Sequence, residues 1–243
     1  MVRGAPGLWC NYACGVGFDG ALTTEELDAL ESYYTEKGLE PRIECTPYVH
    51  PDVLRQLESR LWRIRGFETV FFREISPDSN ITAMVPEPAG LEIIAVPQND
   101  PALLRAFAVT SISGFMAPGC KPTEAQITLA VRSATHPRST AFLAMIHGQP
   151  AAAGSCTICA TRYGTASGLY GLSTLEQFRR QGIQQALIAA RLKYAAAYGA
   201  TVATIGGLPG AGTERNVRRM GFAVAYTMVI LVKPGEGLVP VPD

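Results

Sequence analysis

A basic turn between an extended apolar run and a long helix pattern constrains this chain more than any other feature. Because the first backbone N–H groups of a helix have no partner within the helix, they form a binding site for an anion. Glycine lets a ligand approach the backbone, and arginine adds charge-assisted hydrogen bonds. A strand-turn-helix unit that binds a phosphate or pyrophosphate is therefore predicted at Phe178-Arg179-Arg180-Gln181-Gly182-Ile183-Gln184-Gln185-Ala186-Leu187.

The residues after this turn predict a long, stable helix from about Gly182 to Tyr198, which ends at Gly199. Alanine is frequent in this segment and favours helix formation. Apolar residues repeat along one face, which we expect to pack on a sheet. They are Ile183, Leu187, Ala190, Tyr194 and Tyr198.

The charge balance excludes several classes of function. The chain has 243 residues, of which Lys plus Arg and Asp plus Glu number 21 each. A net charge of zero gives no global attraction to nucleic acid or to an acidic membrane. Since 47% of the residues are hydrophobic, the chain can bury the cores of one large or two modest domains. A small-molecule ligand fits this composition better than a nucleic acid does.

The sequence gives no sign of export or membrane insertion. Residues 1–6 lack the apolar segment of a signal peptide. No run approaches the roughly 18 apolar residues that a membrane helix needs. We therefore expect a cytoplasmic protein that contacts neither membrane nor nucleic acid. A homodimer is left open.

The cysteines do not indicate disulfides or a metal site. In a chain of this length we expect reduced, mostly buried thiols. Cys156 and Cys159 form a C-x-x-C, but in a strand pattern residues three apart face opposite sides. No metal cofactor is expected. The six cysteines are Cys10, Cys14, Cys45, Cys120, Cys156 and Cys159.

The first 75 residues predict the order strand, helix, strand, helix, strand. Thr23 or Thr24 caps the first helix, and Gly38 ends it. The second helix begins at Pro51 and ends at Gly66. Both helices carry their apolar residues on one side, as helices packed on a sheet do. The five elements are expected at residues 11–18, 24–37, 42–46, 51–65 and 68–75.

Turn-forming residues are concentrated at 76–90, where we place a domain boundary. Beyond it, Thr123 and Gln126 match a capping box at the start of one helix, and Thr213 is expected to cap another. Helices are expected at 102–115, 123–134 and 182–198, with a short one after Thr213. Strands are expected at 91–96, 141–146, 151–160, 168–172 and 202–205, with a last strand from Gly221-Phe222 to Val232.

With this order of elements in place, residues 91–233 resemble an N-acetyltransferase domain of the GNAT superfamily. The resemblance covers more than half of the chain and implies an α/β (α+β) fold with a mixed central sheet flanked by helices. It divides the chain into a degenerate GNAT-like domain at 1–85, an acetyl-CoA-binding domain at 91–233 and a tail at 234–243.

The resemblance also implies the cofactor contacts. In that family an R/Q-x-x-G-x-G/A turn binds the pyrophosphate of acetyl-coenzyme A (acetyl-CoA), and residues 179–184 stand in its place. Gln184 departs from the pattern, although glutamine can donate a hydrogen bond itself. The pantetheine arm pairs with the strand before the turn, and Asn216 is a candidate for a further contact with it. The expected cofactor-binding residues are Leu172, Ser173, Thr174, Arg179, Arg180, Gln181, Gly182, Ile183, Gln184, Gln185 and Asn216.

Acetyl transfer requires a deprotonated amine, a polarised thioester carbonyl and a proton for the leaving thiolate. The tyrosine that the family often uses as the acid, four residues before the glycine of the Gly-Phe motif, is Val217 here. Because a thiol has a pKa near roughly 8.5, its thiolate leaves with little help. Tyr226 is a candidate substitute for the acid. Tyr170, Ser173 or a water molecule are candidates to assist deprotonation.

The first 75 residues repeat the order of the second half of a GNAT domain, and Arg65-Gly66-Phe67 echoes the Gly-Phe motif. We therefore expect tandem GNAT-like halves. In place of the basic turn the chain reads Val16-Gly17-Phe18-Asp19-Gly20-Ala21-Leu22, whose aspartate would repel a pyrophosphate. This half is expected to have a structural or substrate-shaping role, with a pocket at Tyr12, Cys14 and Gly15 as the alternative.

The resemblance implies an enzyme that transfers the acetyl group of acetyl-CoA to a primary amine of a small molecule or peptide. We expect direct attack in a ternary complex, since no Cys-His or Ser-His pairing indicates an acyl-enzyme. The alternative is a non-catalytic CoA-binding or interaction protein that keeps the fold. A bulky residue in place of Gly182 is expected to abolish cofactor binding and to leave the fold largely intact.

Overall fold

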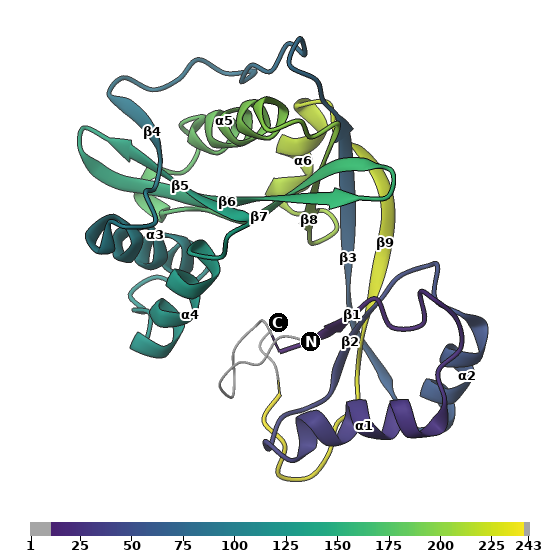
Figure 1. Ribbon diagram of the computed structural model, residues 1–243. Coiled ribbons are helices and arrows are strands. Elements are labelled where there is room, and N and C mark those ends of the chain that lie inside the picture. Colours follow the sequence, from purple (N-terminus) through teal and green to yellow (C-terminus); the bar gives the residue numbers. More distant parts are fainter. Residues whose placement is uncertain (1–10, 241–243) are drawn as a thin grey trace. The chain divides into compact units, whose positions relative to one another are not determined.

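The structure, a computed structural model, describes residues 11–240 (Figure 1). Residues 1–6, Cys10 and the end of the tail lie outside the described residues. The helices are α1 (Thr24–Thr35), α2 (Pro51–Ser59), α3 (Pro101–Ser113), α4 (Glu124–Ala134), α5 (Ile183–Ala197) and α6 (Gly212–Arg219), with a 3₁₀ turn η1 (Glu176–Phe178). The strands are β1 (Ala13–Cys14), β2 (Arg42–Cys45), β3 (Arg63–Glu74), β4 (Leu91–Ala95), β5 (Ser139–Ile146), β6 (Gln149–Thr161), β7 (Gly164–Thr174), β8 (Val202–Gly207) and β9 (Ala223–Val232).

Backbone contacts divide the chain into two compact units. Of the described residues, 11–70 and 225–240 belong to unit 1 and 71–224 to unit 2, so that β3 and β9 have residues in both. The described strands pair in the order β1-β2-β9-β3-β8-β7-β6-β5-β4, which is the mixed sheet expected from the sequence. The assignment of residues 1–85 and 91–233 as domains, with a tail at 234–243, remains a prediction.

In unit 1, α1 connects the parallel strands β1 and β2, and β9 pairs antiparallel with β2. Ile43 and Cys45 of β2 point toward the core that α1 and α2 cover. The expected order of elements is present, but the first strand is two residues long because only Ala13 and Cys14 pair with β2.

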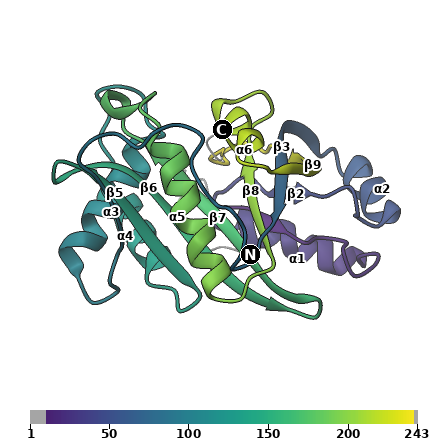
Figure 2. The ribbon, with the colours of Figure 1, turned by 90° about the horizontal axis from the view of Figure 1, so that it is seen from above.

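Unit 2 has three layers. Strands β4 to β7 are antiparallel, and β8 runs parallel to β7. Helices α3 and α4 cover one face of this sheet, and α5 and α6 cover the other (Figures 1 and 2). Side chains alternate along β5 accordingly: Ala141 and Leu143 contact the α3–α4 core, and Phe142 and Ala144 belong to the α5–α6 core.

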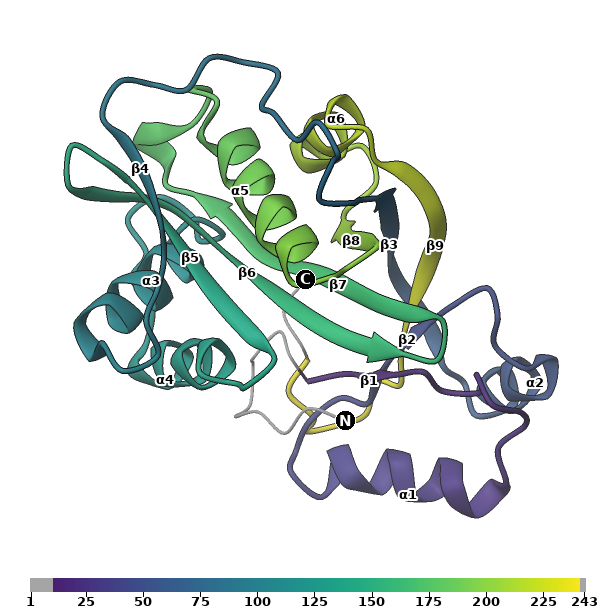
Figure 3. The ribbon, with the colours of Figure 1, turned by 45° about the horizontal axis from the view of Figure 1, so that its top comes forward.

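Helix α5 lies along β6 and β7 (Figure 3). It is buried on most of its circumference, with 10 of its 15 residues buried, and not on one face as expected. Ile183 and Leu187 lie in the core, but Tyr198 is 62% exposed and stacks on Tyr194. The wide burial follows from the connection at residues 75–90, which crosses above the helix in Figure 1 and buries Ile81 in the same core.

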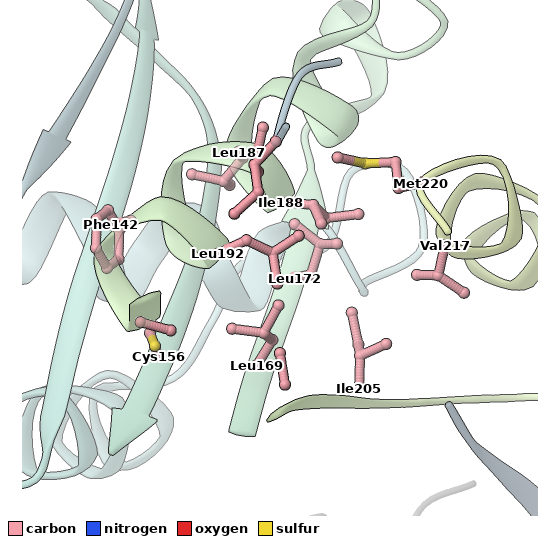
Figure 4. Packing of buried hydrophobic residues seen from close by; sticks show 14 of the residues in the cluster. Phe142, Cys156, Leu169, Leu172, Leu187, Ile188, Leu192, Ile205, Val217 and Met220 are labelled. Carbon is pink, nitrogen blue, oxygen red and sulfur yellow. The ribbon is translucent and has the colours of Figure 1, made fainter. Parts of the chain in front are cut away.

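A β-bulge interrupts β7 at Gly171. Ala153 pairs with Ser173, but Ser155 pairs with Tyr170, so one residue of β6 faces two residues of β7. As a result Leu169 and Leu172 both point into the α5 core, although residues three apart on a regular strand face opposite sides (Figure 4).

Most of the expected helix ends are confirmed. Thr23 and Thr123 each form a capping box, with Glu26 and Gln126 respectively. Gly199, at φ 78°, follows the end of α5. The expected cap at Thr213 is wrong, because α6 begins one residue earlier, after Ala211, and no side chain caps it.

The expected helix at 51–65 is also wrong in its second half. Helix α2 ends at Ser59, and Leu61 adopts a positive φ of 62°. The N–H of Trp62 then donates to the carbonyl of Leu57, which closes the helix as a Schellman motif without glycine. Burial of Trp62 supplies the accompanying apolar contact. Gly66 consequently lies inside β3 and does not end a helix.

Candidate functional site

The N-terminus of α5 presents unpaired backbone donors. Gly182 is the N-cap residue, with φ 82° and no side-chain cap. Within residues 11–240, the backbone N–H groups of Arg180 to Gln184 have no hydrogen-bond acceptor in the protein, whereas Gln185 and Ala186 donate to the Gly182 carbonyl. A run of five free donors at a helix N-terminus is suited to a phosphate or another anion.

The corresponding turn of unit 1 is closed. Helix α1 also follows a strand and precedes its parallel partner, but the Glu26 carboxylate accepts from the N–H of Thr23 at 2.8 Å. The hydroxyl of Thr23 accepts from the N–H of Glu26 in return. The chain thus satisfies these donors itself and adds negative charge from Glu25 and Glu26, so that of these two turns the α5 turn is the one open to an anion.

The two arginines of the α5 turn differ in their contacts. The Arg179 guanidinium donates to the carbonyls of Thr174 (3.2 Å) and Gly114 (3.0 Å), and so joins the ends of β7 and α3 to the turn. Arg180 is exposed, with φ 63°. Arg179 is therefore engaged in holding the turn, and Arg180 is free to face solvent or a ligand.

An amide network holds the first turn of α5. Asn216 of α6 donates to the Gln184 side chain and accepts from Gln185 Nε2 at 3.3 Å. Gln185, which is buried, also accepts from the N–H of Met84 at 3.1 Å. Gln184, the residue that departs from the family pattern, therefore has its side-chain oxygen bound to Asn216.

Strand β7 leaves its parallel partner beside this turn. Pairing with β8 ends at Leu169↔Ile205, while β7 continues to Thr174. Leu172 and Ser173 are buried, and the hydroxyl of Thr174 is buried without a partner among the described residues. The backbone of residues 170–174 is thus an edge past the end of a parallel ladder, where an extended ligand can add as a strand.

The candidate catalytic residues belong to different units. Tyr170, 60% exposed, and Ser173, 4% exposed, lie on either side of the bulge, and Ser173 donates to the Thr110 carbonyl at 3.2 Å. Tyr226 lies in unit 1, where its ring meets that of Tyr48 edge to face. Burial, Tyr48 and two carboxylates raise the pKa of Tyr226.

Those carboxylates, Glu44 and Glu68, are residues that the sequence reading missed. The pKa of Glu44 is raised to about 7, chiefly by burial and also by the nearby Glu68 carboxylate, while Arg42 opposes the shift. Burial also raises the pKa of Glu68. A signal for Glu44 was present in the sequence. Arg42 and Glu44 alternate with the core residues of β2, so these two charged residues share the polar face of the strand.

Residues 11–240 contain neither a metal-ligand cluster nor a membrane-spanning helix. No cluster of three potential metal ligands occurs in residues 11–240. Cys156 is buried and Cys159 half-buried, and both are free thiols. None of the helices described has the length and apolar character needed to cross a bilayer.

Comparison with known proteins identifies the fold. A GCN5-related N-acetyltransferase from Kribbella flavida is 20% identical, with a TM-score of 0.61 over 87% of this chain and 75% of that chain. One from Sphaerobacter thermophilus is 18% identical, with a TM-score of 0.55 over 84% and 64%. A tandem GNAT protein from the clavulanic acid biosynthesis pathway is 13% identical, with a TM-score of 0.59 over 83% and 67%. The expected GNAT fold is confirmed.

No protein-family model and no curated protein matches the sequence. At the identities above, the likeness concerns the fold, and function has to be argued from the site.

Proposed function

We propose that the protein transfers the acetyl group of acetyl-CoA to a primary amine of a small molecule or peptide. The observation that carries the proposal is the α5 N-terminus, where five backbone donors have no acceptor within the described chain. Its fold neighbours include proteins named as N-acetyltransferases, which supports the reaction class. When bound, acetyl-CoA would supply an acetyl group activated as a thioester.

The residues of the site fit this cosubstrate. The N–H groups of residues 180–184 would donate to the pyrophosphate, and Arg180 would add charge. The backbone of residues 172–174 and the unpartnered hydroxyl of Thr174 would take the pantetheine arm. Asn216 would contact the same arm and keep the first turn in place through Gln184 and Gln185.

The surroundings of this strand support direct attack by the amine. Cys156 is fully buried, and burial raises the pKa of its thiol to about 11, so it is a poor nucleophile. The hydroxyl of Ser173 is bound to a backbone carbonyl and not to a base. A ternary complex without an acyl-enzyme is consistent with both observations.

Proton transfer is assigned to tyrosines. The raised pKa of Tyr226 keeps it protonated at neutral pH, as a general acid must be. Tyr170 is exposed and directly follows the last pair between β7 and β8, so it is our candidate to assist deprotonation, together with Ser173 or a water molecule.

A second candidate function is a non-catalytic CoA-binding protein. The observation that favours it is Val217, which stands where the family often has its tyrosine acid and is fully buried in the α5–α6 core. The side chain of Val217 therefore serves packing in the hydrophobic core.

Two measurements decide between these functions. Acetyl-CoA should raise the unfolding temperature in a thermal-shift assay, since a ligand that binds only the folded state stabilises it. Thiol release across a panel of primary amines should then detect turnover. Binding without thiol release would leave the non-catalytic function, and no thermal shift at saturating cofactor would refute both.

A further inference from the structure

Arg191, in the middle of α5, is a buried charge that the cofactor site does not explain. Its exposed fraction is 0%, and it is the largest of the fully buried side chains. Burial lowers the pKa of its guanidinium to about 10, which leaves it charged at neutral pH. The spacing of four residues from Leu187 to Arg191 was the signal in the sequence that this position faces the core.

The guanidinium is bound to backbone carbonyls. Nε donates to the carbonyl of Leu187 at 3.2 Å, and Nη1 donates to those of Ser155 (3.1 Å) and Tyr170 (3.3 Å). Nη2 has no partner within the described residues. The only ionisable group that acts on it is the thiol of Cys156, so no carboxylate of the described chain neutralises this charge.

Gly154 makes room for the guanidinium. A Cβ atom on Gly154 would lie 2.9 Å from Arg191 Nη1, closer than Cβ atoms in proteins approach, and 3.0 Å from Cζ, which is an unusually tight contact. Gly154 is also the single residue of β6 that faces Gly171 and Leu172 across the bulge. The arginine therefore lies directly against the bulge.

The two strand carbonyls that Arg191 binds flank the open edge of β7. Tyr170 is the first residue of β7 beyond the last pair with β8, and Ser155 is its partner on β6. By binding both carbonyls, the guanidinium fixes the point at which β7 stops pairing with β8 and bulges. The edge that follows, at residues 171–174, is the segment assigned to the pantetheine arm.

Packing alone would favour an apolar residue here. The neighbouring core residues of α5 are Leu187, Ile188, Leu192 and Ala195, all fully buried. A buried charge without a counter-ion costs free energy, and even a buried ion pair can often be replaced by apolar residues of similar volume without loss of stability. A residue that breaks the expected pattern of the core, as a charged residue does here, is commonly found at a functional site.

We propose that Arg191 is a positioning residue for acetyl transfer, which sets the bulge of β7 so that residues 171–174 accept the acyl-pantetheine arm. The proposal rests on the proposed function. It separates two parts of the site: the α5 turn, which would bind the pyrophosphate without Arg191, and the β7 edge, which requires it.

The test compares two ligands with Arg191→Met, Arg191→Lys and Gly154→Ala. ADP carries a pyrophosphate but no pantetheine, whereas acetyl-CoA carries both. Arg191→Met should unfold at the wild-type temperature or above and bind ADP as the wild type does. It should lose about 100-fold in kcat/KM for acetyl-CoA, since a displacement of about 1 Å costs this much. Arg191→Lys should recover part of the loss, and Gly154→Ala should reproduce it by displacing the guanidinium.

Arg162→Met, which removes an exposed arginine from the β6–β7 turn, is the matched control and should behave as the wild type. Wild-type kcat/KM in both Arg191→Met and Gly154→Ala would overturn the proposal. An equal loss of ADP and acetyl-CoA binding would also overturn it, because Arg191 would then support the helix as a whole. Absence of acetyl-CoA binding in the wild type would instead refute the proposed function.

Discussion

Replacing Gly182 with alanine tests whether the α5 turn binds the cofactor. An L-residue at φ 82° costs ~1–2 kcal/mol in the left-handed region. The new Cβ would also lie 3.3 Å from the Pro86 carbonyl oxygen and 3.6 Å from Val85. We therefore expect a loss of stability, although the fold should remain largely intact. For a chain of this length the strain corresponds to a fall in Tm of ~2–8 °C.

Gly199→Ala is the matched control for this strain. Gly199 has φ 78° at the other end of the same helix, and a Cβ there meets nothing within 4 Å. Both variants should lose stability, but only Gly182→Ala should lose the stabilisation by acetyl-CoA. At a free concentration of ~100 Kd that stabilisation is ~2.7 kcal/mol, which corresponds to ~5–11 °C. Differential scanning fluorimetry with and without cofactor measures both effects. A full cofactor-dependent shift in Gly182→Ala would refute the reasoning.

The remaining predictions concern unit 1. Thr23→Ala should lower the unfolding free energy by ~1 kcal/mol through loss of the capping box and leave the acetyl-CoA-dependent shift unchanged, as denaturant titrations can check. The unfolding free energy should fall as pH rises from 4.5 to about 7, because the folded state keeps a proton on Glu44 that the unfolded state releases. Glu44→Gln should flatten this dependence, and an unaltered slope would contradict the assignment. Tyr226→Phe should lower kcat without changing acetyl-CoA affinity; unchanged turnover removes Tyr226 from the mechanism.

The order of elements was readable from the sequence because each signal is local. The spacing of Thr123 and Gln126, the Pro51 start and the Gly199 stop each depend on a few neighbouring residues. The end of α2 was predicted wrongly because its signal is not local. There the stop is Leu61 in a conformation rare for leucine, and it is held by burial of Trp62 against other elements.

The candidate site likewise has one part that local sequence patterns predict and one part that they do not. The sequence predicted an open anion turn at residues 179–185, and its five unpaired donors are present in the structure. That Gln184 is bound by Asn216, and that Arg179 holds carbonyls of β7 and α3, depends on segments far apart in the chain. No pattern of neighbouring residues predicts such contacts.

The sequence by itself determined the order of strands and helices, that a glycine-containing basic turn precedes the long helix, and that no charge bias favours nucleic acid. These follow from helix caps, turn residues and periodicity, which act over a few residues. Only the tertiary structure decided that β7 bulges at Gly171 and that a charged Arg191 lies buried against this bulge. Register, burial and the pairing of strands distant in sequence set these features, because they depend on which surfaces meet after the chain has folded.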